Sequence, residues 1–135
     1  MEKKKTAYIS LPITGRDFDE VCTLADIVKA ALSEKYDVIN PLDVAKKYPN
    51  QPWEWYLAWE LENIYSGKID NIVFCEGWMD SRGCRLEMEA VKVYNSFHNE
   101  GKIEINYAQM IPVYGNAMVL SYSDSGETKM FKPNE

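Results

Sequence analysis

The stretch Asn71–Glu87, NIVFCEGWMDSRGCRLE, decides the fold. Its first five residues form an apolar run that is typical of a strand buried on both faces of a parallel sheet. A polar loop with a glycine follows, and the spacing of apolar residues from about Arg82 to Phe97 then predicts a helix. A buried strand that leads through a loop into a helix is the repeating unit of parallel α/β sheets.

The segments before Asn71 repeat this alternation of strand and helix. We expect strands at Ala7–Ser10 and Asp37–Asn40, and apolar residues recur at helical spacing over Val21–Leu32 and Trp53–Ile64. In the helix expected over Arg82–Phe97, one side should carry Leu86, Ala90, Val93, Tyr94 and Phe97. The alternation predicts an α/β domain whose parallel sheet is covered by helices on both faces.

The C-terminal part shows a different pattern. Further strands are expected at Ile103–Tyr107 and Met110–Tyr114. Beyond Gly115, the segments Ala117–Tyr122 and Thr128–Phe131 flank the turn-rich sequence SDSGE, which predicts a hairpin or a loosely attached tail. We therefore divide the chain into a domain over residues 1–114 and a tail over residues 115–135.

Length and composition limit the possible functions. The 135 residues suit one domain, and 46% apolar with 27% charged residues is typical of a soluble globular protein. No apolar run approaches the roughly 18 residues of a membrane span, and we expect a cytoplasmic location. A net charge of −6 without a basic stripe argues against a nucleic-acid polymer or an anionic membrane as partner, but allows a small anion in a local pocket.

Cysteine and histidine are too few for several kinds of site. Three cysteines without a C-x-x-C spacing argue against a disulfide scaffold and a zinc knuckle, and the single histidine, His98, cannot build a His-rich metal site. We expect neither a metal nor another cofactor.

The arginines are confined to two loops, at Arg16, Arg82 and Arg85. Each loop directly follows a predicted strand, and ligands of parallel sheets bind at the carboxyl ends of the strands. Arginine binds phosphate in a forked, bidentate way, so this placement favours a phosphorylated ligand between the loops, although ordinary surface ion pairs would give the same pattern.

Both loops combine hydroxyl groups, glycine and arginine at the start of a helix, where exposed amides favour an anion. The first loop offers Ser10, Thr14, Gly15 and Arg16; a plain turn capped by Thr14 or Asp17 is the alternative. The second loop offers Asp80, Ser81, Arg82, Gly83 and Arg85, and it places Glu87 in the first helical turn, on the side that faces the strand ends. A glutamate there can also simply complement the helix dipole.

The segments YISLPITG (8–15) and GWMDSRGCRLE (77–87) resemble the nucleoside 2-deoxyribosyltransferase-like superfamily. They are most similar to its small branch with YISGPITG and GWxDSRGAxLE, near the 2′-deoxynucleoside 5′-phosphate N-hydrolases. The likeness covers roughly residues 7–95. It implies a flavodoxin-like or Rossmann-like three-layer sandwich with a mostly parallel sheet of about five strands. It also implies a homodimer or larger oligomer that cleaves or transfers the N-glycosidic bond of a deoxynucleoside or its 5′-monophosphate.

The resemblance also implies roles for single residues. Glu87 matches the nucleophile, Tyr8 matches a tyrosine near the sugar, and Ser81 matches a phosphate-holding serine of the monophosphate hydrolases. The assisting acid on the preceding helix matches Glu60, with Glu62 as the alternative. Pro12 departs from the pattern, because the hydrolases have a second phosphate-holding serine there.

The chemistry of such a bond fits the residues. Breaking it passes through an oxocarbenium-like state, which needs a carboxylate at the anomeric carbon and a proton donor for the base. Glu87 would form a glycosyl ester, Asp80 or Glu60 would donate the proton, and water or a second base would resolve the ester. Trp78, in the second loop, is the best candidate to stack on the base.

Three other functions remain open from the sequence. The chain could be a nucleotide-binding sensor without turnover, a transferase acting on free nucleosides, or an oligomeric scaffold. An ion pair between Glu87 and Arg85 would favour the sensor. Trp55 and Trp59 lie four residues apart outside the expected core face, so we expect them at the interface of a homo-oligomer. A tail hairpin folded over both rings is the alternative.

Overall fold

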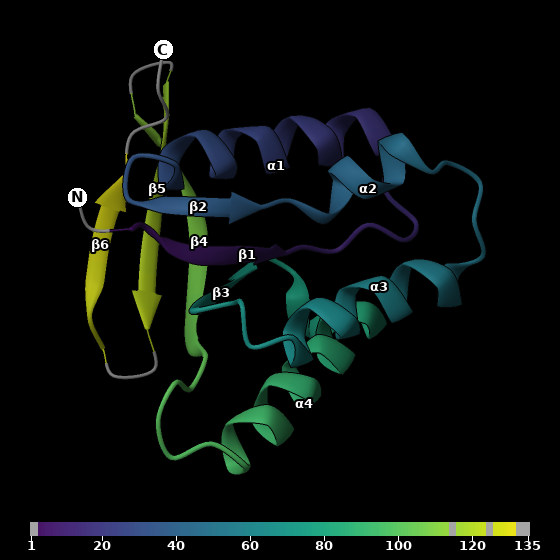
Figure 1. Ribbon diagram of the computed structural model, residues 1–135. Helices are drawn as coiled ribbons and strands as arrows, with labels where there is room; N and C mark the ends of the chain where they lie inside the picture. Colours follow the sequence, from purple (N-terminus) through teal and green to yellow (C-terminus); the bar gives the residue numbers. More distant parts are fainter. Residues whose placement is uncertain (1–2, 114–115, 124–125, 132–135) are drawn as a thin grey trace.

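The computed structural model describes residues 3–113, 116–123 and 126–131. Its elements, in chain order, are β1 (Lys5–Ser10), α1 (Phe18–Leu32), β2 (Tyr36–Ile39), α2 (Pro41–Lys47), α3 (Trp53–Tyr65), β3 (Asn71–Cys75), the short 3₁₀ helix η1 (Trp78–Asp80), α4 (Arg82–Ser96), β4 (Glu104–Val113), β5 (Asn116–Ser123) and β6 (Thr128–Phe131). Figure 1 shows that these strands and helices form one sheet with helices packed beside it. Within the described ranges, no helix has the length and apolar character needed to cross a membrane.

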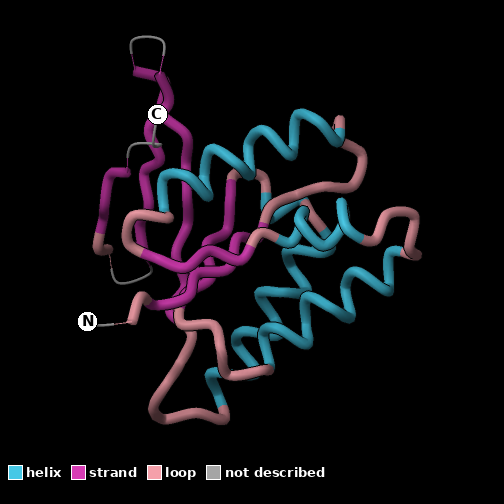
Figure 2. The backbone as a smooth tube through the Cα atoms, turned by 45° about the horizontal axis from the view of Figure 1, so that its top comes forward, coloured by secondary structure: helices cyan, strands magenta, loops and turns pink. Residues whose placement is uncertain are grey.

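The sheet is mixed, which corrects the expected mostly parallel sheet of about five strands. It has six strands in the order β2-β1-β3-β4-β5-β6. The first four strands are parallel, whereas β5 and β6 continue the sheet in antiparallel pairing. The C-terminal segment therefore forms the edge hairpin seen at one side in Figures 1 and 2, and it is hydrogen-bonded to the same sheet.

The strand β4 is one continuous element of ten residues, so the expectation of two separate strands over 103–107 and 110–114 was wrong. The residues between those two segments, Ala108 and Gln109, include no turn former that would break the chain. Residues 104–108 pair in parallel with β3, and residues 106–113 pair with β5. Pairing on both sides keeps the strand extended throughout.

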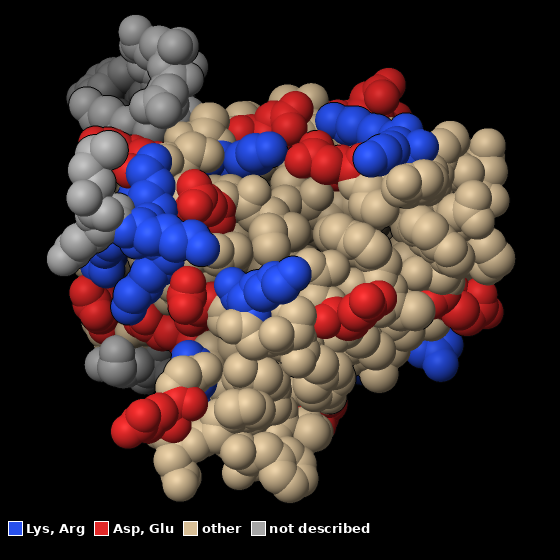
Figure 3. All heavy atoms as spheres, in the orientation of Figure 1, with Lys and Arg blue, Asp and Glu red and all other residues tan. Residues whose placement is uncertain are grey.

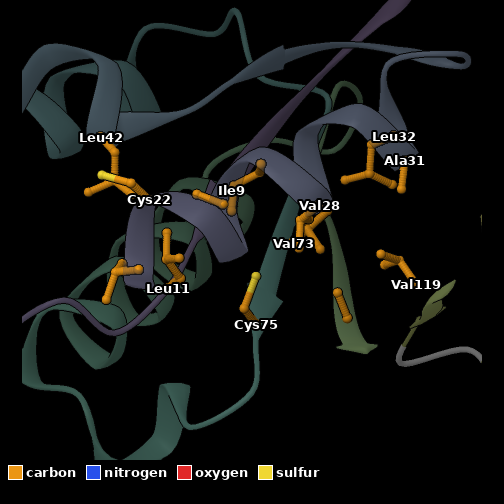
Figure 4. Packing of buried hydrophobic residues seen from close by; sticks show 13 residues of the cluster. Ile9, Leu11, Cys22, Val28, Ala31, Leu32, Leu42, Val73, Cys75 and Val119 are labelled. Carbon is orange, nitrogen blue, oxygen red and sulfur yellow. The ribbon is translucent and has the colours of Figure 1, made fainter. Parts of the chain in front are cut away.

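Helices cover both faces of the sheet (Figure 1). Helix α1 buries the face predicted from its spacing, with Val21, Ala25, Val28 and Leu32 packed on the sheet (Figure 4). Helices α3 and α4 cover the opposite face, where Ile64, Val91 and Tyr94 join a second core cluster. The sheet with its helices on either side is a mixed α/β sandwich.

Helix α2 was not predicted, because Pro41 was interpreted only as the end of a strand. The Asn40 side chain accepts a hydrogen bond from the Leu42 amide at 3.0 Å, and Pro41 occupies the first helical position. An asparagine cap followed by proline is a recognised helix start, so the sequence did carry the signal.

The inward face of α4 differs in part from the predicted one: Ala90 and Tyr94 are buried as predicted, but the other three residues are not. Leu86, Val93 and Phe97, expected inside, are 37%, 44% and 82% exposed. The buried residues are instead Cys84, Glu87, Met88, Ala90, Val91 and Tyr94. The apolar pattern is misleading here because Glu87 lies on the inward face, and a pattern of apolar residues does not include a glutamate.

Trp55 and Trp59, two of the three tryptophans of α3, do not share one exposed surface. Trp59 packs against the core cluster between the sheet, α3 and α4. Trp55 is 38% exposed and packs on the rings of Tyr48 and Tyr56. The β5–β6 hairpin lies at the far edge of the sheet from α3, so it does not cover them (Figures 1 and 2).

Candidate functional site

The two arginine-bearing loops lie side by side at the carboxyl ends of β1 and β3. These strands are neighbours, and Ser10, the last residue of β1, pairs with Phe74 of β3. The chain leaves β1 toward β2 on one side, whereas β3 lies on its other side, so the strand order reverses between them. Open α/β sheets bind their ligands at such a reversal.

The lysines gather elsewhere. Figure 3 shows blue side chains concentrated at the end of the sheet where β1 and β2 begin. Lys3, Lys4, Lys5 and Lys68 line a shallow hollow there. The arginine loops are at the opposite end, so the two groups of cations do not form one surface.

A hollow of about 880 Å³ lies between the two loops, and we call it the arginine hollow. Its lining includes Thr14 and Arg16 of the first loop and Asp80, Ser81, Arg82 and Gly83 of the second. Thus six of the residues expected to act together do share one cavity. Gly15, in the same first loop, has a φ of 80°, a left-handed conformation that favours glycine.

The three arginines are not equivalent in the structure. The guanidinium of Arg82 lies over the Trp53 ring, 5.4 Å from its centroid, and Arg16 Nη1 donates to the Pro12 carbonyl at 3.3 Å. Arg85 is exposed and does not line the arginine hollow. Two arginines, not three, can therefore act on one ligand in this hollow.

Ser81 caps helix α4 at the edge of the arginine hollow. Its Oγ accepts a hydrogen bond from the Cys84 amide at 3.3 Å, and its hydroxyl also interacts with the Cys84 thiol. The helix start and the two guanidinium groups favour an anion, whereas the carboxyl groups of Glu76 and Asp80, which line the same hollow, oppose one.

A second hollow of about 560 Å³ adjoins the first, and we call it the apolar hollow. Helix α2, the loop after it and the start of α3 form most of its wall, with Pro41, Ala45, Tyr56 and Leu57 among the lining residues. Thr14 and Trp53 line both hollows, so the two meet at these residues. The sequence interpretation missed this hollow entirely.

Two glutamates interact with each other next to the hollows. Glu60 lines the apolar hollow. Glu87 is 4% exposed and lines neither hollow, but it lies one helical turn after Gly83 and accepts a hydrogen bond from Ser10 Oγ at 2.9 Å. Its other oxygen, Oε2, and the Tyr8 hydroxyl are both buried without a well-formed hydrogen bond. Buried polar atoms in this state are unusual and mark a place where a ligand group fits.

Burial shifts the titration of both glutamates. Burial raises the pKa of Glu60 to about 8, and the neighbouring charge of Glu87 adds to the effect. Burial raises the pKa of Glu87 to about 7, against the opposing influence of the Tyr8 and Ser10 hydroxyls. Burial and the two carboxylates hold the pKa of Tyr8 well above its usual value. Near neutral pH the carboxyl pair therefore tends to hold one proton between its two members.

The structure separates several sequence alternatives. Glu60, and not Glu62, is the residue of α3 that interacts with Glu87, since Glu62 is exposed. Glu87 forms no ion pair with Arg85 or with any other part of the chain that the structure describes. Asp80 is exposed in the arginine hollow, so it lacks the burial that raises the pKa of Glu60.

Trp78, expected to stack on a base, lines neither hollow, and its role stays a prediction. Its ring packs on Phe74, with centroids 5.0 Å apart, and on Tyr107 at 5.9 Å. Trp53, at the first position of α3, lines both hollows instead. In the sequence, the position of Trp53 directly after Pro52, at the start of the helix, was the feature that could have indicated that its side chain lines a cavity.

The fold and the site together define an α/β protein whose candidate ligand site lies at the carboxyl ends of parallel strands, above a buried pair of carboxyl groups. The chain belongs to the family described as Domain of unknown function (DUF4406), which matches residues 5–97. The match runs from β1 to the end of α4, so it contains both hollows and the carboxyl pair, and it leaves out β4, β5 and β6. No curated protein matches the chain.

Proposed function

We propose that the protein cleaves the N-glycosidic bond of a nucleoside 5′-monophosphate. The observation that carries the proposal is the carboxyl pair Glu60 and Glu87: Glu60 lines the apolar hollow, and Glu87 lies one helical turn after Gly83, which lines the arginine hollow. A nucleotide has an anionic group at one end, a flat heteroaromatic base at the other, and the scissile bond between them. Its phosphate would occupy the arginine hollow and its base the apolar hollow, so that the sugar lies near Thr14 and Trp53.

The two glutamates suit the two roles that this reaction requires. Glu87, with the lower pKa, is the carboxylate that attacks C1′ as the bond to the base breaks. Glu60, with the higher pKa, keeps its proton at neutral pH and transfers it to the departing base nitrogen. Environments that push two carboxyl pKa values apart are a recognised way to divide such work.

The cycle closes with water. Attack by Glu87 forms a glycosyl ester and releases the protonated base, and Glu60 is left as a carboxylate. Glu60 then takes a proton from water, whose oxygen attacks C1′ and displaces Glu87. The products are the free base and the sugar 5-phosphate, and both carboxyl groups return to their starting states. The buried Tyr8 hydroxyl interacts with Glu87 and would help to position it.

The same arrangement supports the proposed relation to the nucleoside 2-deoxyribosyltransferase-like superfamily. The part of the sheet ordered β2-β1-β3-β4 has the parallel order of a flavodoxin-like sheet, and the residues that carry the resemblance meet at its reversal point. The homo-oligomer and the cytoplasmic location expected from the sequence remain predictions.

The test is release of free base from a panel of nucleotides and nucleosides. Purified protein is incubated with deoxy- and ribonucleoside 5′-monophosphates and with the matching nucleosides, and base and sugar phosphate are separated by chromatography. We expect release from monophosphates well above that from nucleosides. A panel in which no compound yields base, with or without a second base as acceptor, would contradict the proposal.

A further inference from the structure

The apolar hollow has a defined place relative to the reaction. Glu60, the proposed proton donor, belongs to its lining, whereas the proposed phosphate ligands Arg16, Ser81 and Arg82 do not. The leaving group must lie where the proton is delivered. A base bound in this hollow meets that condition.

The wall of the hollow suits a flat ring. Phe18, Trp53 and Tyr56 bring aromatic rings to it, and Pro41, Ala45 and Leu57 add aliphatic surface. Aromatic and aliphatic walls bind a heteroaromatic base by stacking and by burial of apolar area, which do not distinguish one base from another. Discrimination has to come from the few polar groups at the rim.

Not all of those polar groups are available. The Tyr56 hydroxyl donates to the Tyr48 carbonyl at 2.6 Å and accepts from the Gln51 amide at 3.1 Å, so it is fully engaged. The side chains of Lys46 and Asn50 make no hydrogen bond or ion pair within the residues that the structure describes. Asn50 has a φ of 64°, a conformation that asparagine tolerates better than most residues, and its amide can donate or accept.

Lys46 is different, because an ammonium group donates hydrogen bonds and accepts none. Lys46 is the one cation among the described residues that line this hollow. A ring carbonyl placed at the rim would accept a charge-assisted hydrogen bond from it, whereas an exocyclic amino group at the same position would present a second donor. The rim therefore favours a base edge that presents a carbonyl group over one that presents an amino group.

We infer that the apolar hollow is the base site and that Lys46 selects a base with a carbonyl group on its outer edge. The inference rests on the proposed function for the orientation of the nucleotide. Lys46 is a specificity-determining residue in this scheme, and Asn50 reads the same edge without preference.

The experiment measures binding, so that it does not depend on turnover. Glu87→Gln protein is titrated by calorimetry with 2′-deoxyinosine and 2′-deoxyadenosine 5′-monophosphates, which differ along one purine edge: the first has a carbonyl at position 6 and N–H at position 1, and the second has an amino group at position 6 and an acceptor nitrogen at position 1. The same titrations are made with Lys46→Met added, and with Lys47→Met added as a matched control. Lys47 is the neighbouring lysine, does not line the hollow, and has its Nζ 5.5 Å from the Tyr48 ring centroid.

We expect the inosine nucleotide to bind about five-fold more tightly than the adenosine nucleotide, as one partly exposed charge-assisted hydrogen bond allows. Lys46→Met should remove this preference, and Lys47→Met should keep it. Equal affinities, a preference that survives Lys46→Met, or an equal loss in both variants would overturn the inference. If one of these outcomes is found and the unmodified protein still releases base, the proposed function is kept and only the inference about Lys46 is overturned. If neither nucleotide binds and no base is released, the proposed function falls and the inference falls with it.

Discussion

The arginine hollow and the apolar hollow meet at Thr14 and Trp53 but are built in different ways. The arginine hollow is made by two loops that directly follow β1 and β3, so its polar groups are fixed by the ends of buried strands. The apolar hollow is made by a short helix, a loop and the start of α3. The comparison indicates that the strand ends position the two arginine loops and the start of α4 with Glu87, whereas α2, the loop after it and α3 position Glu60 and the apolar wall.

The strongest test of this comparison changes Glu87, which lines neither hollow but lies one helical turn after Gly83 of the arginine hollow and next to Glu60 of the apolar hollow. Glu87→Gln keeps the size of the side chain but takes away its nucleophilic charge, and we expect base release to fall by about 10³-fold or more. Chromatographic measurement of base release checks this. Thermal unfolding at pH 8 is the control: the melting temperature should stay the same or rise, because the variant no longer buries a charged carboxylate. Near-normal turnover would show that Glu87 is not the nucleophile.

The pH dependence of base release separates the two glutamates. Release should rise as pH increases through about 7, where Glu87 loses its proton and becomes a nucleophile. It should fall as pH increases through about 8, where Glu60 loses the proton that the base needs. The result is a narrow bell-shaped profile that reports the pair. In Glu60→Gln the rate should drop by about 10²-fold and the alkaline limb should disappear. An unchanged alkaline limb would mean that another group donates the proton.

A third change affects the arginine hollow alone. Arg82→Ala removes a guanidinium that lies over Trp53 and lines the hollow, so the Kd of a nucleoside 5′-monophosphate should rise about ten-fold or more. The affinity for the free nucleoside should change little. Arg85→Ala is the matched control, since Arg85 is exposed on the same helix and outside the hollow. Equal losses for nucleotide and nucleoside would mean that Arg82 is structural.

The smallest expected effect concerns the wall of the apolar hollow. Asn40→Ala removes the side-chain cap of α2 and should lower the free energy of unfolding by about 1 kcal/mol. Chemical denaturation measures this loss. Because α2 contributes to the apolar hollow and not to the arginine hollow, binding of inorganic phosphate should be unaffected. A weaker affinity for phosphate would show that the two hollows are not independent.

The same difference explains what could be predicted from the sequence. The buried strand NIVFC, the loop after it and the position of Glu87 follow from local patterns, because strand, turn and helix start each leave a mark within a few residues. The apolar hollow leaves none. Its apolar, proline and polar residues between Ile13 and Glu60 become a cavity only when three segments of the chain come together. The fold also decides which tryptophan lines a hollow: Trp53 lines both, whereas the Trp78 ring packs on Phe74 of the sheet.

The continuous strand β4 has a consequence for the behaviour of the polypeptide in solution. Its ten residues would be the open edge of the sheet if the β5–β6 hairpin were missing, and a long unpaired edge invites pairing with other chains. The hairpin replaces that edge with β6, which has four residues, among them Lys129. Truncation at the boundary of the family match, residue 97, removes β4 as well and leaves β3 as the exposed edge. Residues 5–97 carry the candidate site, and we expect them to need β4 and the β5–β6 hairpin in order to stay free of aggregation.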